Sequence, residues 1–176
     1  MTTYVYIAKS LDGYIADKNG NVEWLNDIPN PENSDFGFVE FMNKIDAVVM
    51  GRNTFEKVQS FGMWPYHKPV FVISSSINQL WEEFSDKAQI LNLKPLDIIE
   101  QLNTDGMKNL YIDGGALIQS FLREDLIDEL IITSIPVLLG DGIPLFGKLI
   151  NSLKFTHQNT EILLNSLVKS HYIRQR

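Results

Sequence analysis

A glycine pair lies where the sequence predicts that a strand ends and a helix begins. Residues 110–112 are large and apolar, Asp113 precedes Gly114 and Gly115, and a helical pattern begins at Ala116. A strand, a tight turn and a helix N-terminus together present backbone N–H groups that can bind an anion such as a pyrophosphate. A glycine pair after a strand is also common as a simple turn, so both interpretations stay open at this point.

Three further loops with ligand-binding chemistry follow other predicted strands: residues 10–13, 51–54 and 74–76. Because ligands of an open α/β sheet bind at the carboxyl ends of its strands, we expect the four loops to lie together. Arg52 supplies a permanent cation, the serines supply hydroxyl groups and the glycine turns supply backbone N–H groups, all of which bind phosphates. The set predicts a nucleotide-cofactor site, although neither a G-x-G-x-x-G nor a P-loop motif is present.

Asp35 is the candidate proton donor. It lies three residues before Phe38 and seven before Met42, which are on the predicted apolar face of a helix. A carboxyl group near such a face is expected to have a raised pKa, which suits proton donation or binding of a protonated ring edge. The alternative is an acid in the first helical turn, stabilised by the helix dipole. Asp12 is a weaker candidate and is better explained as a turn residue in Leu-Asp-Gly.

The composition excludes several classes of protein. The chain has 176 residues, 44% of them hydrophobic, which predicts one domain over 1–176 with a substantial core. Its net charge of −7 and lack of a Lys/Arg cluster argue against nucleic-acid binding. Without cysteine there is no disulfide or thiolate site, and the three scattered histidines predict no metal centre. We expect no membrane span or signal peptide and a cytoplasmic location, because no long apolar run occurs.

Strand and helix patterns alternate along most of the chain. We expect strands over 3–8, 47–50, 69–73, 88–93, 109–112 and 127–135, and helices over 35–44, 53–59, 79–84, 95–103 and 116–123. Asn33 or Ser34 is the expected cap of the first helix, and Asn53 with Glu56 resembles a capping box. Residues 154–159 and 162–173 predict a closing hairpin. The pattern predicts an α/β fold with a mostly parallel sheet, an antiparallel edge and helices on both faces.

The order and spacing of these pieces resemble the dihydrofolate reductase superfold, and more closely its stand-alone branch, the RibD C-terminal (riboflavin-biosynthesis reductase) domain family. The resemblance covers residues 4–146. The motifs that carry it are Ala8-Lys9-Ser10-Leu11-Asp12-Gly13-Tyr14-Ile15-Ala16, Met50-Gly51-Arg52-Asn53-Thr54-Phe55-Glu56, Val72-Ile73-Ser74-Ser75, Ile112-Asp113-Gly114-Gly115-Ala116, Ser120-Phe121-Leu122, Leu126-Ile127-Asp128-Glu129-Leu130 and Pro136-Val137-Leu138-Leu139-Gly140, with Gly142 and Leu145-Phe146.

The resemblance implies a three-layer, dihydrofolate reductase-like fold and a reductase that uses NADPH. It implies that Gly51, Arg52, Asn53 and Thr54 hold the cofactor phosphates, that Ser74 and Ser75 lie near the adenosine 2′-phosphate, and that Ala8 lies beside the nicotinamide carboxamide. It also implies that Gly114 and Gly115, flanked by Asp113 and Ala116, receive the pyrophosphate.

For the substrate, the resemblance implies that Asp35 is the helix acid of such reductases, with Thr133 as its partner, and that Trp24 forms a wall of the substrate site. His67 falls where dihydrofolate reductases place the basic residue for the folate tail, which disfavours folate itself. We therefore expect reduction of a riboflavin-pathway type of substrate, 5-amino-6-(5-phosphoribosylamino)uracil.

The alternatives are a dihydrofolate or pteridine reductase, or a nucleotide-binding protein without turnover. The resemblance also implies a homodimer. The apolar strand expected over 130–135 is a candidate for pairing with the same strand of a second copy.

Overall fold

The computed structural model describes residues 1–77, 79–80 and 82–176. Within these residues, eight strands form one sheet in the order β5-β4-β3-β6-β1-β7-β10-β9, and β2 pairs with β8 in a small second sheet. The strands are β1 (Thr2–Ser10), β2 (Tyr14–Ala16), β3 (Ala47–Gly51), β4 (Val70–Ile73), β5 (Ala88–Leu91), β6 (Asn109–Asp113), β7 (Glu129–Ile135), β8 (Ile143–Pro144), β9 (Phe155–Leu163) and β10 (Leu167–Arg174). The helices are α1 (Phe38–Lys44), α2 (Arg52–Gln59), α3 (Pro95–Thr104) and α4 (Gly115–Arg123), with short 3-10 helices η1 (Glu23–Leu25) and η2 (Glu82–Phe84).

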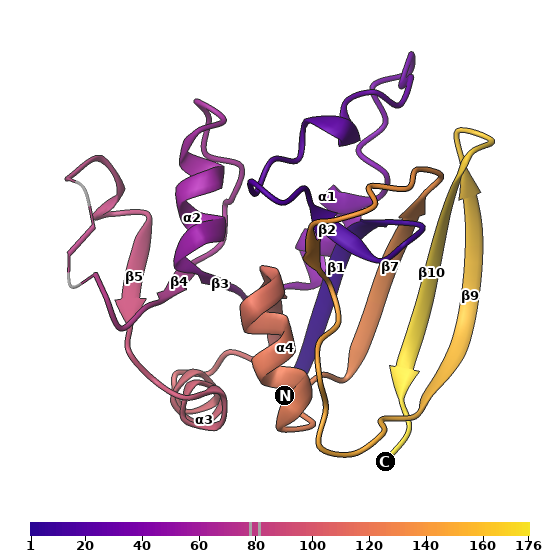
Figure 1. Ribbon diagram of the computed structural model, residues 1–176. Helices are drawn as coiled ribbons and strands as arrows, with labels where there is room; N and C mark the ends of the chain where they lie inside the picture. The colour runs from indigo at the N-terminus through magenta and orange to yellow at the C-terminus, as the bar shows by residue number, and fades with distance from the viewer. Residues whose placement is uncertain (78, 81) are drawn as a thin grey trace.

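The sheet is mostly parallel, as expected. Strands β5, β4, β3, β6, β1 and β7 run in one direction, whereas β10 runs antiparallel to both β7 and β9 (Figure 1). The predicted α/β class and closing hairpin are therefore confirmed. Because the parallel strands share a direction, their carboxyl ends and the loops that follow them meet at one edge of the sheet.

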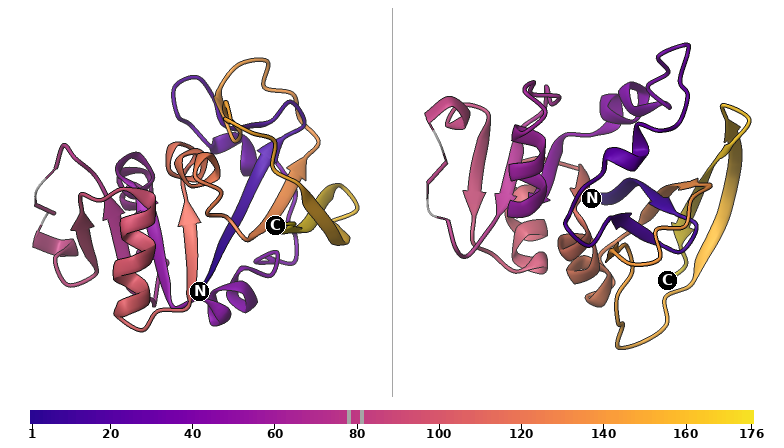
Figure 2. Two further views of the ribbon diagram at one scale, coloured as in Figure 1. Left: turned by 90° about the horizontal axis from the view of Figure 1, so that it is seen from below. Right: turned by 45° about the horizontal axis from the view of Figure 1, so that its top comes forward.

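Helices cover both faces of the sheet, so the three-layer expectation is also confirmed. Apolar residues of α1 and α2 pack with Val48, Met50 and Tyr111 on one face, and those of α3 and α4 pack with Val49 and Ile112 on the other. Figure 2 (left) shows α1 and α4 on opposite sides of β1. Successive strand residues point to opposite faces, which is why neighbouring residues of β3 enter different clusters.

The first face is unusually aromatic. The ring of Phe41 from α1 stacks on Tyr6 of β1 with centroids 4.7 Å apart and meets Tyr111 of β6 edge-on at 5.1 Å. Aromatic contacts of this kind contribute about 0.5–1.5 kcal/mol each beyond the area they bury. They fix α1 on β1 and β6, which lead to two of the four loops.

The predicted helix starts are partly wrong. Helix α1 begins at Phe38 and not at Asp35, and its N-cap is Gly37, with no side-chain cap from Asn33 or Ser34. Phe36 and Gly37 have φ values of +58° and +88°, which are incompatible with a helix and delay its start. The capping box of Asn53 and Glu56 is wrong as well, because α2 begins at Arg52 and no side chain caps it.

Other boundaries differ less. Strand β7 begins at Glu129 where the sequence predicted 127, and the predicted helix over 79–84 includes position 81, which lies outside the described residues. Strand β7 also has partners on both sides, β1 and β10, so residues 130–135 are not an edge available for pairing with a second copy.

In the described part of the chain, every helix is too short or too polar to cross a bilayer.

Candidate functional site

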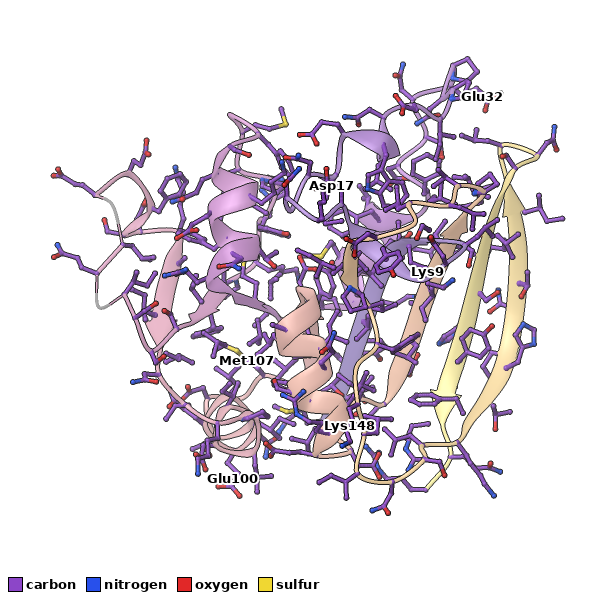
Figure 3. All side chains as sticks on the ribbon, in the orientation of Figure 1. Lys9, Asp17, Glu32, Glu100, Met107 and Lys148 are labelled. Atoms are coloured by element: carbon purple, nitrogen blue, oxygen red, sulfur yellow. The ribbon has the colours of Figure 1, made fainter. Side chains whose placement is uncertain are left out.

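The loops predicted to bind a cofactor follow strand ends at one edge of the sheet. In the register of the sheet, Gly51 of β3 pairs with Ile73 of β4, and Met50 pairs with Asp113 of β6. Figure 3 labels Lys9, near the carboxyl end of β1, and Asp17, just after β2, in one half of the molecule, and Glu100 of α3 and Lys148 in the other. The turns after β3, β4 and β6 are therefore neighbours, as the sequence predicted.

The glycine pair after β6 lies against two neighbouring elements. Gly114 has a φ of +93° and is the N-cap residue of α4. A β-carbon on Gly114 would collide with Thr54 Oγ1 in the first turn of α2, and one on Gly115 would lie 2.8 Å from Ile15 Cδ1 of β2. Only glycine fits both positions, which lets the turn pack directly against α2 and β2.

Asp113 occupies part of the predicted anion site itself. Its Oδ1 accepts a hydrogen bond from the backbone N–H of Gly114 at 2.8 Å. Burial raises the pKa of the Asp113 carboxyl group to about 6, and the Gly114 hydrogen bond and the nearby phenols of Tyr111 and Tyr66 offset only part of that rise. The Gly114 donor is thus already bound by an internal carboxyl group, which the sequence pattern did not indicate.

Arg52 extends across the neighbouring turn. Its Nη1 donates to Ser76 Oγ at 3.0 Å, and its Nε lies 3.4 Å from Glu56 Oε1. Ser74 is buried, and its Oγ accepts the backbone N–H of Ser76 at 3.1 Å, so Ser74 shapes the turn. Ser75 and Ser76 are exposed. Ser76 belongs to the predicted loop 74–76, but the resemblance assigned only Ser74 and Ser75 to the 2′-phosphate.

Asp35 lies in the turn before α1, and the raised pKa expected for it is wrong. Its two carboxylate oxygens accept the backbone N–H groups of Gly37 at 3.0 Å and Val39 at 2.8 Å. These hydrogen bonds, that of Val39 first, hold the pKa of the exposed Asp35 carboxyl group below its ordinary value. Asp35 is therefore an anion at neutral pH. It accepts backbone N–H groups at the start of α1, but it lies before the helix and not in its first turn, where the alternative interpretation placed it.

The structure adds Lys169 to this region. Its Nζ donates to the backbone oxygen of Phe36 at 3.1 Å and pairs with Glu161 at 3.0 Å, while Tyr6 Oη donates to the same backbone oxygen at 2.7 Å. Burial, followed by the charges of Asp35 and Glu161, raises the pKa of Tyr6 to about 12. No local sequence pattern pointed to Lys169, because its partners are more than a hundred residues away along the chain or on the next strand.

Thr133 and Ala8 lie beside this cluster. Ala8 pairs with Thr133 across β1 and β7, and Thr133 pairs with Lys169 across β7 and β10. Paired residues of adjacent strands share a face, so the three form a row. Within the described residues, no hydrogen bond joins Asp35 to Thr133, so the partnership implied by the resemblance stays a prediction.

The two predicted substrate residues lie apart. Trp24 belongs to η1, which an ion pair between Glu23 and Lys57 at 3.3 Å ties to α2, and its indole N–H is buried with no partner among the described residues. His67 is exposed in the loop before β4, where it lines a surface hollow with Lys68 and Lys87. The structure therefore does not bring His67 together with the loops that follow the strands.

Asn53 and Ala116 are exposed near the starts of α2 and α4, as a contact with a ligand requires. Asp12, in contrast, has a structural explanation. Its carboxylate accepts the N–H of Gly140 at 2.7 Å and the hydroxyl of Ser10 at 2.5 Å, which joins the turns after β1 and β7.

Comparison with known proteins gives consistent results. The sequence profile of the RibD C-terminal domain matches residues 2–168. The chain is 37% identical over 175 residues to the Bacillus subtilis (strain 168) protein YwjB, covering 98% of this chain and 97% of YwjB. A crystal structure from Shewanella sp. PV-4, provisionally named a riboflavin biosynthesis protein, matches with a TM-score of 0.97 at 51% identity over 100% of both chains.

A more distant structural match is the Thermotoga maritima diaminohydroxyphosphoribosylaminopyrimidine deaminase/5-amino-6-(5-phosphoribosylamino)uracil reductase. It matches with a TM-score of 0.77 at 16% identity, over 99% of this chain and 56% of that one. At this level of identity the similarity supports the fold alone.

Proposed function

Because the chain belongs to the RibD C-terminal domain family, we propose that it is an NADPH-dependent reductase of a small heterocyclic substrate of the riboflavin-pathway type. The observation that carries the proposal is the contact between the Gly114 turn and the first turn of α2 at Thr54. This contact brings two strand-to-helix turns together where strand ends of an α/β sheet bind ligands.

The residues present fit a dinucleotide that carries phosphates. Gly114 and Gly115 keep side chains out of the turn, and the N-terminus of α4 follows it. Arg52 and the exposed hydroxyl groups of Ser75 and Ser76 are suited to the additional 2′-phosphate that distinguishes NADPH from NADH. The nicotinamide of such a cofactor supplies a hydride when it is bound.

Asp35 is suited to orienting the substrate. A carboxylate with a lowered pKa accepts hydrogen bonds from an N–H edge and is a poor proton donor at neutral pH. Aminopyrimidines and pteridines both present such an edge, so a pteridine reductase is the second candidate. The position of His67 away from the turns gives no support to a substrate that needs a cation there.

Oxidation of NADPH by the purified protein tests the proposal directly. The assay compares three substrates, 5-amino-6-(5-phosphoribosylamino)uracil, dihydrofolate and a dihydropteridine, each with NADPH and with NADH. We expect turnover with NADPH and a pyrimidine or pteridine, and loss of at least about tenfold in turnover number for Asp35→Asn.

Binding of NADPH with no turnover on any of these substrates, and no effect of Asp35→Asn, would favour the third alternative of a nucleotide-binding protein. Failure of NADPH to bind at all would contradict the proposal.

A further inference from the structure

Asp113 is a half-buried residue at the turn where the proposed function would place a pyrophosphate. Its Oδ1 is held by the Gly114 N–H at 2.8 Å, so this side chain and a bound anion both approach the same turn. Asp113 is paired with Met50 of β3, an apolar and fully buried neighbour. This apolar neighbour reduces the solvent that can screen the charge of Asp113 from an arriving anion.

The ionisable side chains that face Asp113 are phenols. Tyr66, from the loop after α2, and Tyr111, from β6, are both buried, and the charge of Asp113 contributes to raising the pKa of each. The Tyr111 hydroxyl donates to the backbone oxygen of Tyr6 at 2.9 Å, so it is already committed. Neither phenol supplies a positive charge.

The charged residues of the adjacent helix do not compensate. Arg52 and Glu56 of α2 pair with each other at 3.4 Å, with 41% and 53% of their side chains exposed. A second negative charge at the turn is therefore opposed by the Asp113 carboxylate, and protonation of that carboxylate is the nearest way to relieve the repulsion.

We propose that Asp113 takes up one proton from solvent when an anionic dinucleotide binds at the Gly114–Gly115 turn, so that binding and protonation are coupled. This inference rests on the proposed function, because it requires the cofactor phosphates to lie at this turn. No electrons move in this step: a proton leaves the buffer and forms the O–H bond of the Asp113 carboxylic acid. The protonated group can then donate a hydrogen bond to a phosphate oxygen.

The direction of the pH dependence follows from linkage. In the free protein the Asp113 carboxyl group has a pKa of about 6, and a bound anion raises it further. Binding is then tightest at a pH where Asp113 is protonated in both the free and the nucleotide-bound protein. It weakens as the pH rises from the pKa of Asp113 in the free protein towards its pKa in the complex. The decrease in affinity approaches about tenfold per pH unit within that window.

Calorimetric titration with NADH at neutral pH tests the proposal, because the pyrophosphate of NADH does not titrate there. Titrations in two buffers with different ionisation enthalpies give the number of protons taken up on binding. We expect the wild-type protein to take up roughly 0.5–0.9 proton more than Asp113→Asn. Asparagine keeps the size of the side chain and an oxygen that accepts the Gly114 N–H.

Asp12→Asn is the matched control, because Asp12 also accepts a glycine N–H at this edge but is exposed. This variant should take up as many protons as the wild type. Equal proton uptake by the wild type and Asp113→Asn would overturn the inference while leaving the proposed function intact. Absence of binding by NADH and NADPH in the wild type would instead overturn the proposed function.

A second variant keeps the test decisive if Asp113→Asn does not fold. Tyr66→Phe removes a phenol that stabilises the charged form of Asp113, so it should raise the free pKa and reduce proton uptake on NADH binding. Unchanged uptake in Tyr66→Phe, together with a wild-type affinity for NADH that is independent of pH from about 6 to 8, would count against the coupling.

Discussion

Thr54 Oγ1 occupies the space that a β-carbon on Gly114 would need. The two residues come from different crossover connections, the start of α2 and the start of α4, so their contact locks two strand-to-helix turns together. The stability of this edge of the sheet therefore depends on this pair of residues.

Gly114→Ala should destabilise the protein by at least about 2 kcal/mol, because the positive φ alone costs roughly 1–2 kcal/mol for an L-residue and the collision with Thr54 adds to it. Urea unfolding measures the loss. Gly106→Ala is the matched control, since Gly106 has a φ of +88° but no atom within 4 Å of its added β-carbon. Equal losses in the two variants would contradict the role assigned to Thr54.

Arg52→Met should weaken NADPH binding by about tenfold or more, which is the loss of one charge-assisted hydrogen bond of about 1.4 kcal/mol. The affinity for NADH should change by less than about threefold, because NADH has no 2′-phosphate. Fluorescence titration with each nucleotide measures both.

Glu56→Gln is the control for Arg52→Met, because it removes the carboxylate that pairs with Arg52 and keeps the cation. It should leave NADPH affinity unchanged or slightly increased. An equal loss of NADH and NADPH affinity in Arg52→Met would show that Arg52 does not contact the 2′-phosphate.

Asp35→Asn should alter the dependence of stability on pH. The pKa of Asp35 is lowered in the folded protein, so its ionisation stabilises the fold above the unfolded pKa of about 3.9. That stabilisation is lost as the pH falls through the lower folded pKa. Denaturant unfolding of both proteins from neutral to acid pH should show a difference that shrinks towards the acid end. A difference that grows with acidity would mean that the pKa is raised.

Phe121→Ala should cost about 3–5 kcal/mol of unfolding free energy, because Phe121 of α4 is fully buried against the sheet. Phe61→Ala makes the same chemical change at a side chain that is 54% exposed and should cost less than about 1 kcal/mol. Thermal or urea unfolding compares the two. Similar losses would contradict the packing of α4 onto β1, β6 and β7.

Much of the architecture was predictable because local patterns determine it. The continuous apolar run at 47–50 predicts a strand buried on both faces, and the apolar spacing at 116–123 predicts a helix, both of which the structure contains. The carboxyl-end rule then placed the loops after β3, β4 and β6 at one edge without any knowledge of their contacts.

The environment of Asp35 was not predictable from the local sequence. Its turn is held by Lys169 and Tyr6, which both donate to the Phe36 backbone oxygen from strands distant in sequence. Helical spacing placed Asp35 on α1, whereas the positive φ values of Phe36 and Gly37 place it outside the helix. A pattern of residue types contains no information about such long-range hydrogen bonds.

The hydrogen bond between Asp113 and Gly114 was missed for a similar reason. The glycine pair predicted free backbone donors, but the side chain just before it turns back onto one of them. Burial raises the pKa of that carboxyl group, and the nearby Gly114 N–H and the phenols of Tyr111 and Tyr66 offset only part of the rise. Sequence position identified the turn, and packing determined its electrostatics.

The central claim is that NADPH binds at the turn formed by Gly114 and Thr54. Calorimetric titration of the wild-type protein with NADPH, in parallel with Gly114→Ala, tests it most directly. We predict that the wild type binds one NADPH per chain with a dissociation constant below about 1 mM. At a temperature where Gly114→Ala is still folded, the affinity of this variant for NADPH should be at least about tenfold lower. Absence of saturable NADPH binding by the folded wild-type protein at millimolar concentration would contradict the claim.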